Sequence, residues 1–264
     1  MVGLDNIDPQ RRHWYSEEHF ARQLGNPAAR AVVEGRWRLL EAEVKRWLER
    51  DRPAQASSSA PLRILDAGCG DGINLLALSR IFADLRRPIR LQGIDYNDLR
   101  IERAKALGLD CELGVGSLAD TGLAAASVDM ILLNHVLEHI PDKQVVLGEL
   151  RRILRPGGLF VVGVPNEGCT LAKLRNRVLQ RSILRTTDHV HFFTSTELRR
   201  SLEAAGFKVD RIAVEGFFVP HLRIASLAGR TAAGRSMMAF LGSKLPSQAA
   251  GLIAIARAGD ATAG

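Results

Sequence analysis

Residue types that could perform chemistry gather in two parts of this sequence, and the first is a glycine-rich turn flanked by acids. Asp66-Ala67-Gly68-Cys69-Gly70-Asp71-Gly72 follows a short apolar run and precedes helix-spaced apolar residues that begin at Ile73. A strand, a tight turn and a helix start in this order let the backbone approach a nucleotide-like ligand closely. A dinucleotide-binding turn needs a third glycine where this chain has Ile73, and the Asp66 carboxylate would repel a pyrophosphate. The turn therefore favours a ligand with a cationic, amine-bearing end over NAD.

The second part comprises two pairs of histidines. His135 and His139 flank the segment Val136-Leu137-Glu138, and His189 and His191 follow Asp188. Histidine has an unperturbed pKa of about 6.5 and is a natural base for removing a proton from a hydroxyl group. In a short extended segment His189 and His191 share one face, and Asp188 is placed to orient His189. We predict His135, His189 and His191 as catalytic residues; the alternative for each is a histidine that anchors the core or a loop.

Five segments of the sequence, taken together, resemble the class I S-adenosylmethionine (SAM)-dependent methyltransferases, in particular the small-molecule and ubiquinone-biosynthesis type. The resemblance spans about residues 61–215 and its segments occur in order. They are Leu65–Gly72, Gly93–Tyr96, Asn134–Asp142, Leu154–Gly158 and Ala205–Val209. The resemblance implies an enzyme that binds SAM and transfers its methyl group to an acceptor.

The resemblance also implies roles for the acids and glycines of the cofactor site. Gly68 and Gly70 would let the backbone pass close to the amino-acid tail of SAM, with Asp66 compensating its ammonium or sulfonium. Asp95 ends the second predicted strand, where a carboxylate accepts hydrogen bonds from both ribose hydroxyls. The alternatives are a tight turn without a ligand and, for Asp95, a helix N-cap.

Three further residues complete the implied cofactor site. Tyr96 would pack on the adenine, Ser117 would contact the adenine edge, and Asn134 would approach the sulfonium. Ordinary packing is the alternative for Tyr96. The predicted cofactor-binding residues are Asp66, Gly68, Cys69, Gly70, Asp95, Tyr96, Ser117 and Asn134.

A metal ion is a further question that the resemblance raises. In the similar ubiquinone-type O-methyltransferases an acidic position and a Glu-His pair can hold magnesium. This chain has the pair as Glu138 and His139, but it carries His135 at the position of the first acid. Because a hard cation prefers oxygen ligands, we predict no metal.

Strand and helix patterns alternate along most of the chain. We predict strands over residues 62–66, 90–95, 110–113, 128–133, 158–164, 207–214 and 248–256. We predict helices over residues 72–83, 98–107 and 143–154, and another that starts at the capping box of Thr194 and Glu197. This alternation predicts an α/β, Rossmann-like fold with a seven-stranded, mainly parallel sheet and helices on both faces. The resemblance implies that the last strand belongs to an antiparallel hairpin at the sheet edge.

The remaining segments are expected to cover this sheet. A periodic helix over 27–50 and the polar linker over 52–59 make residues 1–60 an N-terminal helical cap, followed by a SAM-binding methyltransferase domain over 61–264. That domain carries insertions at about 168–187 and 216–247. Both insertions and the N-terminal helix are candidates for a lid over the substrate; a packing or dimer surface is the alternative for 216–247.

Charge and composition limit the class of protein. The 264 residues carry a net charge of +7, and acids are absent from residues 168–187 and 216–259. Such stretches suit a phosphate-bearing substrate, RNA or an anionic membrane surface, with a solvated basic face as the alternative. The scattered cysteines Cys69, Cys111 and Cys169 indicate neither disulfides nor zinc, and without a signal peptide or membrane-spanning run we expect a cytoplasmic protein.

We therefore expect a SAM-dependent methyltransferase that acts on a small-molecule acceptor, most simply by O-methylation of a hydroxyl. The alternatives are an RNA acceptor, against which the chain shows no added recognition domain, and a non-catalytic methyltransferase-like subunit. Peripheral membrane contact through 216–247 would suit an anionic or lipid-linked acceptor, although core packing explains the same apolar residues. These residues are Phe217, Phe218, Leu222, Ile224, Leu227, Met237, Met238, Phe240 and Leu241. The oligomeric state stays open.

Overall fold

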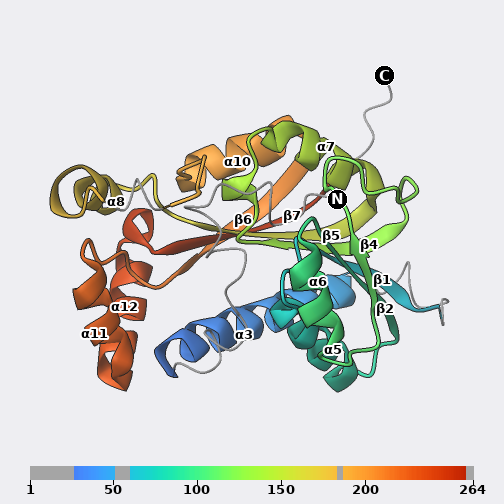
Figure 1. Cartoon of the computed structure of the whole chain (residues 1–264), viewed down its shortest axis with the longest axis horizontal. Coiled ribbons are helices and arrows are strands. Elements are labelled where there is room, and N and C mark those ends of the chain that lie inside the picture. Colours follow the sequence, from blue (N-terminus) through green and yellow to red (C-terminus); the bar gives the residue numbers. More distant parts are fainter. Residues whose placement is uncertain (1–26, 51–59, 183–186, 260–264) are drawn as a thin grey trace.

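A computed structural model describes residues 27–50, 60–182 and 187–259 (Figure 1). The described residues contain one seven-stranded sheet with the order β3-β2-β1-β4-β5-β7-β6. Its strands are β1 (Leu62–Ala67), β2 (Ile89–Asp95), β3 (Glu112–Val115), β4 (Val128–Asn134), β5 (Leu154–Pro165), β6 (Phe207–Glu215) and β7 (Gly251–Ala258). Strand β7 runs antiparallel to both β5 and β6, while β1 to β5 pair in parallel. The predicted Rossmann-like, mainly parallel fold is confirmed.

The central strands read as continuous apolar runs because both faces of the sheet are covered. Alternate side chains of β4 point to opposite sides: Ile131 and Leu133 belong to one buried cluster, and Met130 and Leu132 belong to the other. The apolar stripes of the surrounding helices complete the two clusters, and the core therefore lies on both faces of the sheet.

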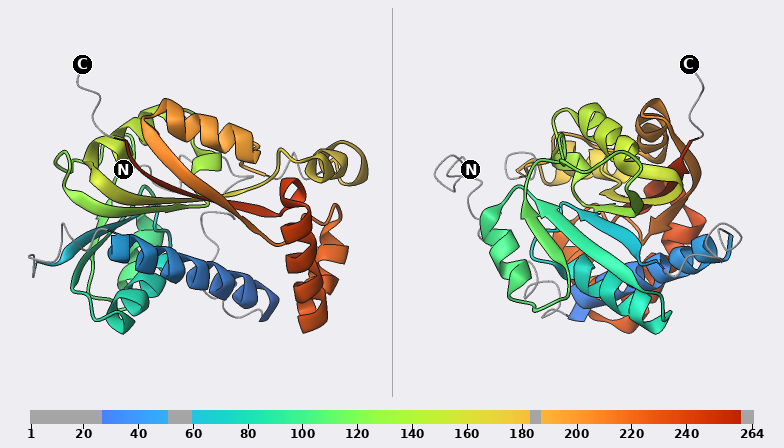
Figure 2. Two further views of the ribbon diagram at one scale, coloured as in Figure 1. Left: turned by 180° about the vertical axis from the view of Figure 1, so that it is seen from behind. Right: turned by 90° about the vertical axis from the view of Figure 1, so that its right-hand side faces the viewer.

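Helices on both faces are also confirmed, and Figures 1 and 2 show them as two layers with the sheet between. One layer is formed by α7 (Lys143–Ile153) and α10 (Ser195–Ala204), which bury Leu147 and Leu198. The other layer is formed by α3 (Pro27–Arg50), α5 (Ile73–Asp84) and α6 (Asp98–Lys105). Helix α10 starts at the predicted capping box, in which Thr194 and Glu197 bond reciprocally.

Helix α3 shares its core with the sheet. Val44 and Trp47 are buried in the cluster that also holds Leu78 of α5 and Ile64 of β1. The predicted linker over 52–59 lies outside the described residues. The division of the chain at residue 60 therefore stays a prediction.

Three strands begin two or more residues away from their predicted starts. Strand β5 begins at Leu154, where a helix end was predicted, and it includes Gly157 with a left-handed φ of 72°. Strand β3 begins two residues later than the predicted 110. Strand β7 begins at Gly251 because residues Pro246–Gln248 form a single 3-10 turn, η4, that starts at a proline.

Both predicted insertions are helical. The first contains α8 (Thr170–Leu174) and a turn of π-helix, η3 (Arg175–Leu179). The second contains α11 (Leu222–Arg230) and α12 (Ala232–Lys244), which form a helical hairpin beside α3. Within the described part of the chain, every helix is too short or too polar to cross a membrane.

Candidate active site

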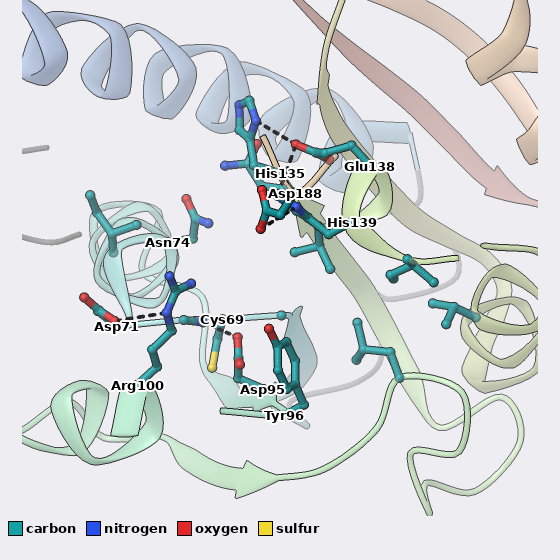
Figure 3. A pocket seen from close by; sticks show the side chains of 18 of the residues that line it. Cys69, Asp71, Asn74, Asp95, Tyr96, Arg100, His135, Glu138, His139 and Asp188 are labelled. Carbon is teal, nitrogen blue, oxygen red and sulfur yellow. Dashed lines mark hydrogen bonds and ion pairs between the residues drawn. The ribbon is translucent and has the colours of Figure 1, made fainter. Parts of the chain in front are cut away.

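A cleft of about 920 Å³ opens at the carboxyl ends of β1, β2 and β4 (Figure 3). The parallel register brings these ends together, because Ala67 pairs with Ile94 and Asp66 pairs with Leu132. In an open α/β sheet, ligands bind at this edge. Helix α3 closes the opposite side of the cleft with its first turns, including Val33 and Trp37.

The glycine turn forms the floor of the cleft. Gly68, Gly70 and Gly72 have left-handed φ values of 74°, 53° and 88°, which only glycine adopts freely. A Cβ on Gly68 would lie 2.4 Å from Cγ2 of Val136, so a larger residue would disturb the turn that follows β4. Helix α5 begins directly after Gly72 and has no side-chain cap. Its first amide groups can therefore meet an anionic group of a ligand.

Asp95 joins the glycine turn to β2. Its Oδ2 accepts a hydrogen bond from the Gly70 amide at 2.9 Å, and its Oδ1 accepts one from the Asn97 amide at 2.9 Å. The N-cap of α6 is Asn97, whose side chain accepts from the Arg100 amide, so the helix-cap alternative does not describe Asp95. Burial raises the pKa of Asp95, although the two amides oppose this shift. Each carboxylate oxygen keeps a lone pair for a further donor from the cleft.

Asp66 lies beneath the turn and is fully buried, so it does not line the cleft itself. Neither of its carboxyl oxygens has a hydrogen-bond partner among the described residues. Burial, with a smaller contribution from the charge of Asp95, raises the pKa of Asp66 to about 8. The group is therefore protonated at neutral pH until a positive charge comes near.

This shift has a consequence for stability. Because the folded-state pKa of Asp66 exceeds its usual value of 3.8, the contribution of Asp66 to the free energy of unfolding falls as the pH rises from about 4 to about 8. Asp66→Asn removes this titration, so we expect its melting temperature relative to wild type to increase across that range. Thermal denaturation of both proteins at several pH values measures the difference. A difference that is constant with pH would contradict the assignment.

The other predicted cofactor residues surround the same cleft. Tyr96 is half exposed at its rim, and the Ser117 hydroxyl accepts a hydrogen bond from the Ala119 amide. Asn134 is the last residue of β4 and pairs with Gly163 of β5. A Cβ added to Gly163 would lie 2.2 Å from Oδ1 of Asn134. Cys69 is buried, and burial raises the pKa of its thiol far above the usual range, so it is no nucleophile.

Glu138 connects the two histidine pairs. The residue is completely buried, and its Oε1 lies 3.1 Å from Nδ1 of His135 and 3.9 Å from Nε2 of His139. Burial would raise the pKa of Glu138, but the hydrogen bond and charge of His135 and the charge of His139 lower it overall. The Glu138 carbonyl accepts hydrogen bonds from the amides of Val190 and His191. Glu138 therefore fixes the second histidine segment against the first.

His135 lines the cleft with an unusual backbone. Its φ of 55° is left-handed, which is rare for a residue other than glycine and is found preferentially at functional sites. The conformation is held by a 2.8 Å hydrogen bond from the His135 amide to the Gly163 carbonyl and by the contact with Glu138.

His189 also lines the cleft, but the residue that orients it is not the predicted one. Asp188 lies 3.2 Å from Nδ1 of His139 instead. Nδ1 of His189 contacts Oε2 of Glu167 at 2.5 Å, and Oε1 of Glu167 accepts a hydrogen bond from Arg175 at 2.8 Å. Burial lowers the pKa of His189, but the hydrogen bond and charge of Glu167 outweigh it and raise the pKa overall.

Glu167 was missed from the sequence, although one signal was available. It is an acid that comes just after Pro165, the last residue of β5, and acids in this position lie at the ligand-binding edge of a parallel sheet. What the sequence could not show is that the chain returns after the first insertion to place His189 beside it.

His191 does not line the cleft, which corrects its prediction as a catalytic residue. Its Nε2 contacts the carbonyls of Ile140 and Pro141 at 3.0 and 3.3 Å. Both acceptors require a proton on this nitrogen. His191 thus anchors the loop before α7, which is the alternative that the sequence left open.

One group of side chains in this part of the structure could hold a metal ion. Glu138, His139 and His189 each offer a ligand atom, and these atoms lie within 4.8 Å of one another. One carboxylate and two imidazoles do not fit magnesium, which is bound mainly through oxygen ligands. The same side chains already pair with His135, Asp188 and Glu167. The absence of a required metal stays a prediction.

Comparison with known proteins places this geometry in context. Residues 35–212 match a family described as a methyltransferase domain. A probable S-adenosylmethionine-dependent methyltransferase of Mycolicibacterium smegmatis is 33% identical over 147 residues, which cover 56% of this chain and 52% of that protein. This chain thus spans about half the length of that relative.

Two further proteins are similar over a larger share of their length. A ubiquinone biosynthesis O-methyltransferase of Cupriavidus pinatubonensis is 29% identical over 188 residues, which cover 67% of this chain and 72% of that protein. The solved structure of an S-adenosylmethionine-dependent methyltransferase from Mesorhizobium loti superposes with a TM-score of 0.52 at 20% identity and covers 80% of this chain and 97% of that chain. At this identity the superposition supports the fold alone.

Proposed function

The chain belongs to the class I SAM-dependent methyltransferase family, and we propose that it methylates a hydroxyl oxygen of a small-molecule acceptor. The observation that carries the proposal is the Glu167–His189 pair, which places an oriented base in the cleft whose floor is the cofactor turn. When bound, SAM supplies an electrophilic methyl group on a sulfonium, which is a good leaving group. The protein must then align the acceptor, exclude water and take up one proton.

The residues of the turn fit this cofactor. The glycines allow close approach of the backbone, and the uncapped start of α5 offers amide donors to a carboxylate. Asp95 has acceptor capacity left for ribose hydroxyls. The orphaned Asp66 carboxyl beneath the turn suits a ligand that brings positive charge, since a cation would favour its ionised form.

His189 is the proposed general base. Because its Nδ1 contacts the Glu167 carboxylate, the neutral ring carries its proton on Nδ1 and leaves Nε2 as the acceptor. Arg175 holds Glu167 from the other side, and Glu167 is shielded from water. The Glu167 carboxylate also stabilises the imidazolium that forms when His189 takes the acceptor proton.

Part of the cleft lining is apolar. It includes Val33 and Trp37 of α3 and, from the chain after β4, Ile140 and Val145. Such walls suit a flat, hydrophobic molecule, and a phenolic ring would combine that shape with a hydroxyl of the right acidity. The ubiquinone biosynthesis O-methyltransferases among the relatives support an oxygen as the methylated atom.

The sequence suggested that the basic insertion over about 168–187 could bind RNA. The structure gives this alternative less support. Arg175 is buried and paired with Glu167, and its guanidinium stacks over Phe218 at 4.8 Å. Arg181 donates to the Arg177 carbonyl. Arg175, which an RNA acceptor would need on the surface, is therefore buried beside the candidate active site.

Incubation with isotopically labelled SAM and a panel of catechols and phenols tests the proposal. We expect label on the acceptor oxygen, located by mass spectrometry and NMR, and the same rate with EDTA as with added Mg²⁺, because the donor set does not fit magnesium. Label found only on ring carbons of these compounds would overturn O-methylation, and loss of activity in EDTA would overturn the metal prediction.

A further inference from the structure

Helices α11 and α12 both expose apolar side chains and cations, and we propose that this face of the hairpin binds the surface of an anionic lipid bilayer. This proposal rests on the proposed function, because it assumes a hydroxyl compound as the acceptor. It adds that this acceptor is dissolved in the bilayer. The binding itself can be measured without any acceptor.

Large apolar side chains project from the hairpin into solvent. Leu227 is 66% exposed and Ile224 is 59% exposed on α11, while Met237 and Phe240 are 58% and 57% exposed on α12. Side chains of this size are normally buried, and a group of them on one element marks an interaction surface.

The hairpin is rigid enough to hold these side chains outward. A Cβ on Gly234 would lie 2.1 Å from the Ala228 carbonyl oxygen, so the two helices are in close backbone contact. Gly242 is buried against the Gly216 carbonyl in the same way. Arg235 of α12 donates a hydrogen bond to the Gly229 carbonyl of α11 at 3.0 Å and so links the two helices. The exposed apolar groups therefore cannot be covered by a small rotation of either helix.

The charged side chains that the hairpin itself carries are all positive. On α11, Arg223, Leu227 and Arg230 are spaced so that they share one helix face, and both arginines are exposed. On α12, Lys244 lies one turn beyond Phe240 and its Nζ is 5.8 Å from the phenyl ring. Residues 216–259 contain no acid. Apolar side chains bordered by arginine and lysine match acyl chains beneath anionic headgroups.

The same charges argue against other occupants. A second copy that packed this face against itself would bring like charges together without an acid to pair with them. RNA would leave the apolar side chains in water, because on this face Phe240 is the only exposed aromatic ring among the described residues that could stack on a base. A bilayer accommodates both properties.

The position of the hairpin explains what such binding would achieve. Helix α11 packs against α3, and Figures 1 and 2 show the hairpin beside the first turns of α3. Nε of Arg36, on α3, donates to both carboxylate oxygens of Glu215, the last residue of β6, at 2.9 and 2.7 Å. Because Val33 and Arg36 also line the cleft, a molecule leaving the bilayer at this face would meet the cleft without a long path through water.

Flotation of the full chain with vesicles tests the proposal. We expect binding to phosphatidylcholine vesicles that contain phosphatidylglycerol and little binding to phosphatidylcholine alone. Leu227→Ser/Phe240→Ser should lower partitioning by at least about tenfold, and Arg223→Gln/Arg230→Gln/Lys244→Gln should do the same. The controls remove exposed groups of the same kinds elsewhere: Val115→Ser on β3, and Arg200→Gln/Lys208→Gln on α10 and β6.

Each outcome bears on the proposal. Equal binding to neutral vesicles, unaltered binding of the hairpin variants or no flotation would overturn it. The proposal would also be overturned if the hairpin variants lost dimerisation or RNA binding and not vesicle binding. SAM affinity equal to wild type shows that the variants are folded. If methylation of a water-soluble phenol persists without flotation, only the membrane proposal fails. If flotation occurs and no hydroxyl is methylated, the proposed function fails by itself.

Discussion

Asp95→Ala is expected to weaken SAM binding by at least about 100-fold. Hydrogen bonds that involve a charged group contribute about 1.5–3 kcal/mol each, and about 1.4 kcal/mol corresponds to a factor of ten. The variant loses both proposed bonds to the ribose. It also releases the Gly70 amide, which the Asp95 carboxylate holds at 2.9 Å, so the glycine turn loses its link to β2.

Isothermal titration calorimetry with SAM measures this loss. Asp98→Ala is the matched control, because Asp98 is a nearby exposed acid whose carboxylate contacts only the Leu99 amide among the described residues. Circular dichroism and the melting temperature of both variants show whether the fold survives. Wild-type affinity in a folded Asp95→Ala protein would remove this carboxylate from the cofactor site.

The arrangement of strands and helices was predictable because local patterns and the global fold agree. The buried run of β4 and the amphipathic stripe of α7 are each typical of one element, and the capping box at Thr194 marks a helix start by itself. Prediction failed at the start of β5, because residues 155–157 were left between a predicted helix that ends at 154 and a predicted strand that begins at 158. The pairing of Val128 with Leu154 on a neighbouring strand decides that boundary, and no local pattern contains it.

The side of the cleft that the glycine turn forms was predictable for a similar reason. Its residues come from short segments at the carboxyl ends of strands. The parallel register brings those ends together regardless of the conformation of the connecting loops. Gly68, Asp95 and Asn134 therefore reach one cleft from positions far apart in the sequence.

The acceptor side was not predictable to the same degree. Asp188 precedes His189 in the sequence, yet it turns to His139, and Glu167 takes its place from the far end of the first insertion. Arg175 looked like a surface cation and is a buried partner of Glu167. These pairings depend on how a long connection folds back on itself, which side-chain spacing along the chain does not encode.

His189→Ala is expected to lower kcat by about 10²–10⁴-fold, the usual contribution of a general base, and to leave SAM affinity unchanged. His189 lines the cleft and contacts Glu167, and it belongs to a different segment from the glycine turn. His221→Ala is the matched control, because His221 precedes α11 and does not line the cleft. Single-turnover rates with saturating SAM separate the chemical step from binding. A kcat within a factor of a few of wild type would exclude His189 as the base.

The pH dependence distinguishes a base from a residue that only shapes the cleft. Only neutral His189 can accept a proton, so kcat of the wild type should rise with pH through a pKa above the ordinary 6.5, since the charges of Glu167, Glu138 and Asp188 outweigh burial. Glu167→Gln removes the largest of these charges. The rise should then move to lower pH, because burial alone favours the neutral ring, while the plateau falls as the ring loses its orientation. NMR titration of the His189 ring should show the same direction of shift, and a profile that stays in place while the plateau falls would assign Glu167 a purely structural role.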